Sequence, residues 1–173
     1  MTRLTLIAAL DEDGAIGRAS GGLPWHLPDE TAHFRAYCRG KWLLVGRRTF
    51  DEMTGWFQPG HHVCVLSRHP AGADHTAAIP AVPIRRVATV REAVELAREA
   101  GAPELVTLGG ALVFAEALPS ADRLVLSRIH LRSGAEVRFP ELDTRQWRLD
   151  DRGPRRDAAT GIAFTVEHWH RKT

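Results

Sequence analysis

The chain has 173 residues, 44% of them hydrophobic, and a formal net charge of +2 at pH 7. This composition suits a single domain over residues 1–173, and the balanced charge argues against broad electrostatic binding to nucleic acid or to a membrane. No segment predicts a signal sequence or a membrane span, so we expect a cytoplasmic protein, and we expect a monomer. The two cysteines, Cys38 and Cys64, have apolar neighbours that predict buried free thiols.

A buried strand and a flexible loop are predicted at the start of the chain. Residues 4–10 are apolar apart from Thr5, as expected for a strand that is covered on both faces. Residues 11–22 then contain four glycines, whose conformational freedom is typical of a loop that acts as a lid. Ile16 is the one large apolar residue of this loop, and it either pins the loop to the core or contacts a ligand.

Residues 21–30 place a carboxylate at the start of a helix. Pro28 favours the first helical position, so we expect a helix from Pro28 to about Arg39, with Glu30 in its first turn. Acidic residues in a first turn are usually solvated and stabilised by the helix dipole. Here Trp25 and the flanking prolines would instead shield the carboxylate from water and raise its pKa toward the range that is useful in acid–base chemistry.

Two further predicted strands each end beside arginine. Residues 42–45 are followed by Gly46-Arg47-Arg48 and a helix start, and residues 62–67 are followed by Arg68. A strand, a glycine and a helix start form a phosphate-site layout, because free N–H groups face the anion. Ligands of open α/β sheets lie beyond the carboxyl ends of the strands, so the three arginines are expected to converge on one phosphate.

A second interpretation of the same turn involves no ligand. Thr49 and Glu52 have the spacing of a capping box, in which the two side chains satisfy backbone N–H groups at a helix start. The neighbouring arginines would then be ordinary solvated side chains. For the Thr49–Glu52 pair alone we favour the capping box, whereas three arginines at strand ends favour the phosphate site.

The rest of the chain alternates strands with helices and ends in a hairpin. We predict a surface loop at residues 67–80, strands at 82–87, 104–108 and 122–129, helices at 89–100 and 111–118, and an antiparallel pair at 146–151 and 162–169. This order predicts an α/β fold, a three-layer sandwich with a mostly parallel central sheet and a C-terminal antiparallel hairpin.

Two features of the later segments bear on ligands. Gly109-Gly110 would let the pyrophosphate of a cofactor approach the backbone, although the G-x-G-x-x-G fingerprint is absent and a standard dinucleotide fold is therefore disfavoured. Nine histidines occur, but His61-His62, His168 and His170 lack the spacing of a metal site, so we predict solvated histidines and no metal.

Taken together, the chain resembles the dihydrofolate reductase family. The matching segments follow the family's order: Ile7-Ala8-Ala9, Ile16-Gly17, Leu23 to Glu30, Val45 to Phe50, Leu66-Ser67-Arg68, Leu108-Gly109-Gly110 and Phe139-Pro140. The resemblance implies a dihydrofolate-reductase-like fold and the NADPH-dependent reduction of 7,8-dihydrofolate to 5,6,7,8-tetrahydrofolate by hydride transfer.

The resemblance also implies roles for individual residues. Glu30 would bind the pterin and support its protonation, Trp25 would hold an ordered water there, and Leu23 would lie in the mobile lid. The implied substrate contacts are Ile7, Ala8, Glu30, Thr31, Phe34, Arg35, Met53, His61, Leu108 and Ser127. The implied NADPH contacts are Ala9, Ile16, Gly17, Gly46, Arg47, Arg48, Thr49, Leu66, Ser67, Arg68, Gly109, Gly110, Ala111, Leu112, Val113 and Phe114.

This sequence departs from the family's pattern at a few positions. His61 follows the Pro-Gly turn, where the family usually has an arginine for the carboxylate tail of the substrate, and Arg35 is the candidate substitute. Ala111, Phe114 and His26 stand where glycine, tyrosine and asparagine are frequent, without consequence for the reaction. The alternatives are a related NADPH-dependent pterin or riboflavin-pathway reductase of the same fold and a non-catalytic protein that binds NADPH or a pterin.

Overall fold

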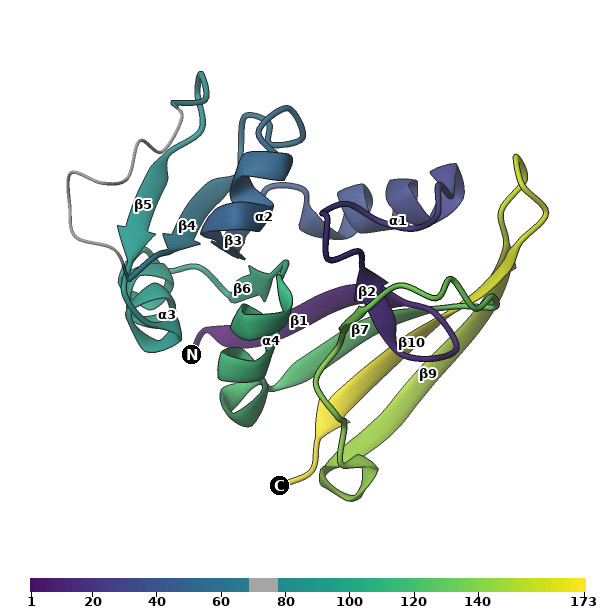
Figure 1. The fold of residues 1–173 in the computed structure, drawn as a ribbon. Coiled ribbons are helices and arrows are strands. Elements are labelled where there is room, and N and C mark those ends of the chain that lie inside the picture. The colour runs from purple at the N-terminus through teal and green to yellow at the C-terminus, as the bar shows by residue number, and fades with distance from the viewer. Residues whose placement is uncertain (69–77) are drawn as a thin grey trace.

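A central sheet of eight strands organises the computed structural model, which describes residues 1–68 and 78–173. The strands follow the order β5-β4-β3-β6-β1-β7-β10-β9, and Figure 1 shows them running from β5 at one edge to the long β9–β10 hairpin at the other. The strands are β1 (Arg3–Leu10), β3 (Trp42–Gly46), β4 (His62–Leu66), β5 (Ile84–Val87), β6 (Glu104–Thr107), β7 (Arg123–Ile129), β9 (Trp147–Arg156) and β10 (Ala163–Arg171). A small second sheet pairs β2 (Ala15–Gly17) with β8 (Val137–Arg138).

The predicted mostly parallel topology is confirmed. Every neighbouring pair from β5 to β7 is parallel, whereas β10 runs antiparallel to both β7 and β9. The helices are α1 (Pro28–Cys38), α2 (Arg47–Glu52), α3 (Val90–Glu99) and α4 (Ala111–Ala117), with short 3-10 turns η1 (Leu118–Ser120) and η2 (Thr144–Gln146). Of the predicted surface loop at 67–80, residues 69–77 lie outside the described part of the chain.

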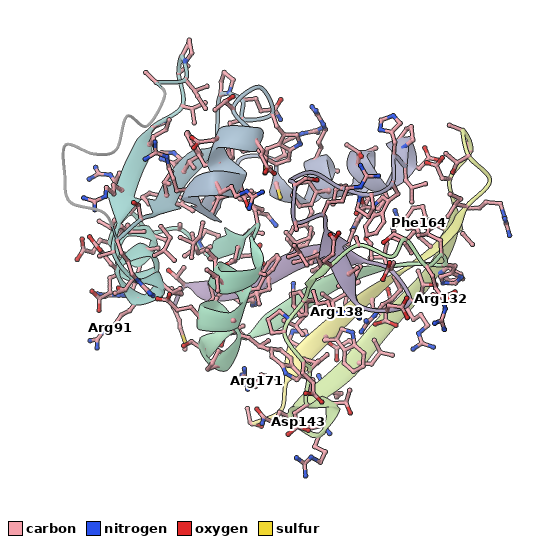
Figure 2. All side chains as sticks on the ribbon, in the orientation of Figure 1. Arg91, Arg132, Arg138, Asp143, Phe164 and Arg171 are labelled. Atoms are coloured by element: carbon pink, nitrogen blue, oxygen red, sulfur yellow. The ribbon has the colours of Figure 1, made fainter. Side chains whose placement is uncertain are left out.

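Each face of the sheet has its own core. Residues of α3 and α4, including Ala93 and Phe114, pack on one face, and residues of α1 and α2, including Cys38 and Phe50, pack on the other. The predicted three-layer sandwich is therefore confirmed. Charged side chains such as Arg132 extend from the surface, whereas Phe164 of β10 is fully buried (Figure 2). Within the described residues, no helix is long and apolar enough to cross a membrane.

Helix α1 is capped from the far end of the chain. Pro28 occupies its first turn, as predicted, but Leu27 provides no side-chain cap. The missing acceptor is supplied by the fully buried Asp157, whose Oδ1 accepts a hydrogen bond of 2.8 Å from the Asp29 N–H. The Asp29 carboxylate in turn accepts a 2.7 Å bond from the N–H of Ala158. The turn between β9 and β10 thus fixes the first turn of α1.

The other end of α1 is held by a second buried carboxylate. Glu104 at the start of β6 accepts hydrogen bonds from Tyr37 of α1 at 2.8 Å and from Thr5 of β1 at 2.5 Å, and it forms an ion pair of 2.7 Å with Lys41. Burial alone would raise the pKa of Glu104, but these three donors together lower it below its usual value. The carboxylate therefore remains ionised and ties α1 to two central strands.

We predict that Asp157→Ala lowers the thermal midpoint by about 5 °C at pH 7, since the first turn of α1 loses the carboxylate that accepts from the Asp29 N–H. The hydrogen bond from Asp29 lowers the pKa of Asp157. The stabilising effect of the Asp157 carboxylate is therefore complete above about pH 4, which is the pKa of an aspartate in the unfolded chain. It is lost as the pH falls through the lower folded-state pKa. Calorimetry from pH 7 to pH 2 should show the gap between wild type and variant closing in acid. The exposed Asp151→Ala is the control, and an equal effect of both substitutions would contradict the cap.

Candidate active site

A cleft of about 1000 Å³ opens at the carboxyl ends of the parallel strands. Most of the residues assigned to the site from the sequence line it together: Ile7, Ala8, Ala9, Ile16, Gly17, Leu23, Glu30, Thr31, Phe34, Gly46, Arg47, Arg48, Thr49, Met53, Leu66, Arg68, Leu108, Gly110, Ala111, Leu112, Val113 and Phe114. This position is the one that open α/β sheets provide for ligands. Leu23 and Leu112 are exposed apolar residues on its rim, and Leu112 is 87% exposed.

Glu30 is the buried carboxylate of this cleft. It is only 5% exposed although it lies in the first turn of a helix, so the solvated interpretation of this residue is wrong. Burial raises the pKa of Glu30, and a hydrogen bond from the Ser127 side chain of β7 opposes the rise in part. Trp25 packs into the same core as α1 and is buried, as expected for a residue that shields this region from water.

Arginines line the opposite end of the cleft, after β3 and β4. Arg47 and Arg48 form the first turn of α2, and Arg68 follows β4. Each of them has an acidic partner: Arg47 Nε lies 3.2 Å from Asp51, Arg48 Nε lies 3.6 Å from Glu52, and Arg68 pairs with Glu116. The three arginines therefore line one cleft, and the acids partly neutralise their charge; their convergence on one phosphate stays a prediction.

The predicted Thr49–Glu52 capping box is wrong. Helix α2 begins at Arg47 and takes Gly46 as its N-cap residue, so Thr49 lies inside the helix. The extended backbone of Gly46 leads directly from β3 into the helix, which leaves no room for a later start. Thr89 caps the start of α3, since its Oγ1 accepts a 3.1 Å hydrogen bond from the Glu92 N–H. The Glu92 side chain accepts from the Ala88 N–H rather than from Thr89, so the two residues form only half of a capping box.

Glycines allow strand β3 and the start of helix α4 to pack closely together at the base of the cleft. The Gly46 N–H donates a 2.8 Å hydrogen bond to the Gly109 carbonyl, and a Cβ atom on Gly46 would lie 3.0 Å from Val113. Gly110 faces the Thr49 hydroxyl, which a Cβ atom would approach to 3.2 Å. Gly109 has φ +112° and leaves 3.0 Å for a Cβ atom beside the Phe114 ring. Glycine at these positions therefore permits the close packing of β3 and α4, while the approach of a pyrophosphate to Gly109-Gly110 stays a prediction.

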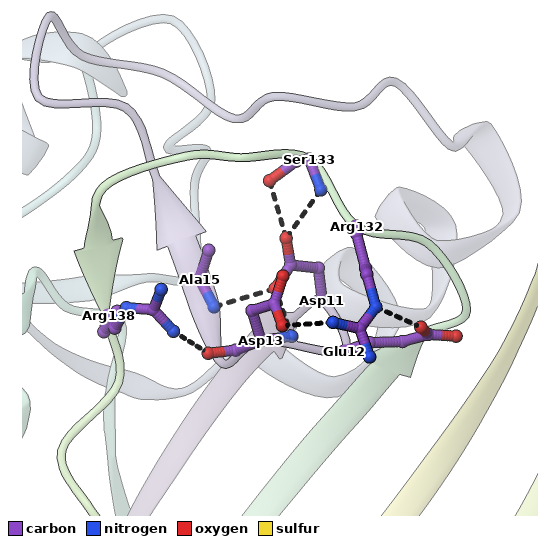
Figure 3. A network of polar contacts seen from close by, with 7 residues as sticks. All are labelled: Asp11, Glu12, Asp13, Ala15, Arg132, Ser133 and Arg138. Atoms are coloured by element: carbon purple, nitrogen blue, oxygen red, sulfur yellow. Dashed lines mark hydrogen bonds and ion pairs between the residues drawn. The ribbon is translucent and has the colours of Figure 1, made fainter.

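The glycine-rich loop is fixed at its base by a polar network. Asp11 accepts hydrogen bonds from the Ala15 N–H at 2.9 Å and from the Ser133 hydroxyl at 2.6 Å, and Arg132 forms an ion pair with Asp13 at 3.0 Å (Figure 3). Further along the loop, Arg48 donates a 2.7 Å bond to the carbonyl of Ala19. The loop is therefore held by the 132–138 segment on one side and by an arginine of the cleft on the other.

Six of the residues assigned from the sequence do not line the cleft: Trp25, Arg35, His61, Ser67, Gly109 and Ser127. Ser127 still acts on it through Glu30, and Arg35 lies near its mouth, with the guanidinium carbon 5.9 Å from the centre of the Trp56 ring. The site residues that the sequence analysis did not assign are Arg18, Gly21, Gly22, Glu52, Trp56, Glu116 and Val137.

His61 differs most from its predicted environment. It is 1% exposed, so the prediction of a solvated side chain is wrong. The imidazole stacks on Trp56 with ring centroids 5.3 Å apart and planes 13° apart, and Trp56 separates it from the cleft. Burial lowers the pKa of His61, and a hydrogen bond involving the Cys38 backbone opposes this in part. His61 is therefore a neutral aromatic support for Trp56 at pH 7.

The sandwich and its cleft define an α/β enzyme with its site at the ends of parallel strands, and comparisons with known proteins agree. The sequence model of the family described as "Dihydrofolate reductase" matches residues 3–171. The chain is 36% identical to a dihydrofolate reductase of Neisseria gonorrhoeae, with 98% of each chain covered, and 34% identical to one of Mycobacterium tuberculosis, with 99% of each covered. The chain belongs to the dihydrofolate reductase family, and on this ground it is an oxidoreductase.

A solved structure supports the same assignment. The dihydrofolate reductase of Enterococcus faecalis, complexed with NADP(H) and the compound RAB-propyl, superposes with a TM-score of 0.84 at 30% identity. The match covers 99% of this chain and 97% of the other. The family match and this superposition favour dihydrofolate reductase over the related pterin and riboflavin-pathway reductases considered above.

We predict that Gly109→Ala destabilises the protein by about 2–4 kcal/mol, through its positive φ and the contact with Phe114. Gly101→Ala is the matched control, because Gly101 also has a positive φ, of +73°, but has open space around its Cβ position. The Gly101→Ala control should lower the free energy of unfolding by only about 1–2 kcal/mol. Urea unfolding of both variants measures the difference, and equal losses would refute the close approach at Phe114.

Proposed function

We propose that the cleft reduces 7,8-dihydrofolate to 5,6,7,8-tetrahydrofolate with NADPH, and that Glu30 anchors the pterin. The observation that carries this proposal is the dry Glu30 carboxylate at one end of a cleft whose other end is lined by arginines. The reaction adds one hydride and one proton across a C=N bond. NADPH, when bound, supplies the hydride, so the protein must position the ring and provide a path for the proton.

The residues at the arginine end fit such a cofactor. Phosphates prefer guanidinium donors, which Arg47, Arg48 and Arg68 supply, and a planar fork of donors recognises a 2′-phosphate that NADH lacks. Gly46 and Gly110 both line the cleft, and because they carry no side chain a pyrophosphate can approach their backbone. Helices α2 and α4 have only six and seven residues, so the arginines rather than helix dipoles carry most of the attraction.

Glu30 fits the pterin end for a different reason. A carboxylate with little access to water is best satisfied by two parallel N–H donors, which the 2-amino group and N3 of a pterin present together. The raised pKa of Glu30 keeps a proton available closer to neutral pH than an exposed glutamate would, which supports protonation of N5. Ser127 fixes the carboxylate from the sheet side, and the apolar side chains of Ile7 and Phe34 line the cleft around it.

The proposal is tested by Glu30→Gln, which should lower turnover of dihydrofolate at pH 7 by at least about a hundredfold while NADPH binding stays within about twofold. Because the folded-state pKa of Glu30 is raised, its ionisation opposes folding, and stability is lost as the pH rises through that value. The variant should therefore melt at a higher temperature than wild type at pH 8 and at the same temperature at pH 4.

Two results would contradict this role. Unchanged turnover of Glu30→Gln would remove Glu30 from the mechanism, and tight binding of NADPH and dihydrofolate by the wild type without any loss of reduced nicotinamide would favour the non-catalytic alternative. Glu99→Gln is the control, since this exposed residue of α3 lies outside the cleft and loses the same charge.

The mouth of the cleft predicts weak recognition of an acidic substrate tail. Trp56 and Phe34 line it, the buried imidazole of His61 is neutral, and Arg35 is the nearby cation of α1. A single exposed arginine contributes little to binding a carboxylate compared with a shielded bidentate pair.

We expect KM for a dihydropterin without the glutamate tail to lie within about tenfold of KM for dihydrofolate. Steady-state kinetics measures both values, and a loss of a hundredfold or more would contradict the expectation. Arg35→Gln then shows how much of the remaining discrimination that residue provides.

A further inference from the structure

The cofactor end of the cleft contains a carboxylate whose position is fixed by two different elements. Glu116 of α4 lines the cleft and pairs with Arg68, the residue that lies just beyond the end of β4. Its other oxygen accepts a hydrogen bond of 3.4 Å from the N–H of Val90, the first residue of α3. The side chain of Glu116 is 28% exposed, whereas that of Arg68 is 72% exposed. The carboxylate is thus the more buried partner and has a second contact, whereas the guanidinium is largely exposed.

This pair differs from the other two arginine–acid pairs of the cleft. Arg47–Asp51 and Arg48–Glu52 are i,i+4 pairs within the short helix α2, and both acids are largely exposed. Such local pairs are weak and exchange readily with solvent. The Arg68–Glu116 pair instead joins segments 48 residues apart in the sequence and turns the guanidinium toward α4.

The strand order places Arg68 at the far end of the cleft from Glu30. Glu30 is hydrogen-bonded to Ser127 of β7, and Arg68 follows β4, which is separated from β7 by the three strands β1, β6 and β3. An extended dinucleotide with its nicotinamide near Glu30 therefore places its adenosine end near Arg68. The exposed Leu112 is a further lining residue of the cleft and belongs to the same helix as Glu116.

We propose that Glu116 is a specificity-determining residue that limits the preference for a cofactor with a 2′-phosphate over one with a 2′-hydroxyl. This inference rests on the proposed function. Glu116 occupies donors of Arg68 that a phosphate would otherwise receive, and its negative charge opposes the approach of a dianion. A neutral 2′-hydroxyl experiences neither effect. The enzyme keeps a preference for NADPH through its arginines, and Glu116 sets how large that preference is.

The test compares cofactor binding by wild type and Glu116→Gln, with NADPH, NADH, 2′,5′-ADP and 5′-AMP as probes in calorimetry. At an ionic strength of about 0.02 M we expect Kd for NADPH and 2′,5′-ADP to fall about two- to fivefold, and Kd for NADH and 5′-AMP to change by less than about 1.5-fold. At about 0.5 M salt the gain should disappear, because both charges are near the surface.

Two further variants separate Arg68 from other causes. Glu95→Gln changes the net charge equally but loses a pair with Arg91 on α3, outside the cleft, and should leave all four dissociation constants unchanged. In an Arg68→Gln background, the gain from Glu116→Gln should largely vanish, since the freed donors are absent. Glu116→Ala should have the same effect as Glu116→Gln, and melting temperatures of all variants verify that they are folded.

Several results would overturn the inference. Weaker NADPH binding by Glu116→Gln would mean that the acid orients Arg68 productively, and equal gains for NADPH and NADH would mean a general charge effect. An equal loss for all four probes would mean that Glu116 binds the adenine common to them. If wild type and variants bind none of the probes, the proposed function itself fails, which is a different outcome from binding that Glu116 does not influence.

Discussion

The clamp on helix α1 is the constraint on which the site depends. Asp157 of the β9–β10 turn satisfies the first turn of the helix, and Glu104 of β6 holds Tyr37 near its end. Both carboxylates are buried and keep lowered pKa values, since several donors surround each of them. With both ends fixed, the first turn cannot rotate to bring Glu30 into water, and the carboxylate stays within the cleft with a raised pKa.

The two ends of the cleft use charge in opposite ways. At the Glu30 end, one carboxylate is isolated from water, so its ionisation is costly and a forked pair of donors is strongly preferred. At the other end Arg48 and Arg68 are exposed, Arg47 is half-buried, and all three are paired with acids, so each contributes modestly and their combined field matters more. A ligand that spans the cleft thus meets a strict hydrogen-bonding requirement at one end and an adjustable electrostatic one at the other.

The sequence predicted the sheet topology well because that topology follows from local patterns. Buried strands, helix starts at proline and the final antiparallel pair all have signals within a few residues. The features it missed depend on distant contacts. Asp157 caps a helix 128 residues earlier, and His61 is buried because Trp56 covers it, neither of which a local pattern encodes. The misassigned capping box at Thr49 has the correct spacing, but the strand continues without a break into the helix through Gly46.

The acids beside the cleft arginines reflect a conflict between stability and binding. Guanidinium groups gathered for a phosphate repel one another in the absence of ligand, and a nearby carboxylate relieves that repulsion. The same carboxylate then competes with the phosphate for donors. Where the acid is exposed and on the same short helix, as for Asp51 and Glu52, solvent screening makes the competition weak. Where it is anchored by a second element, as for Glu116, the competition persists during binding. The placement of one acid relative to the backbone therefore decides whether it only stabilises the free enzyme or also sets its cofactor selectivity.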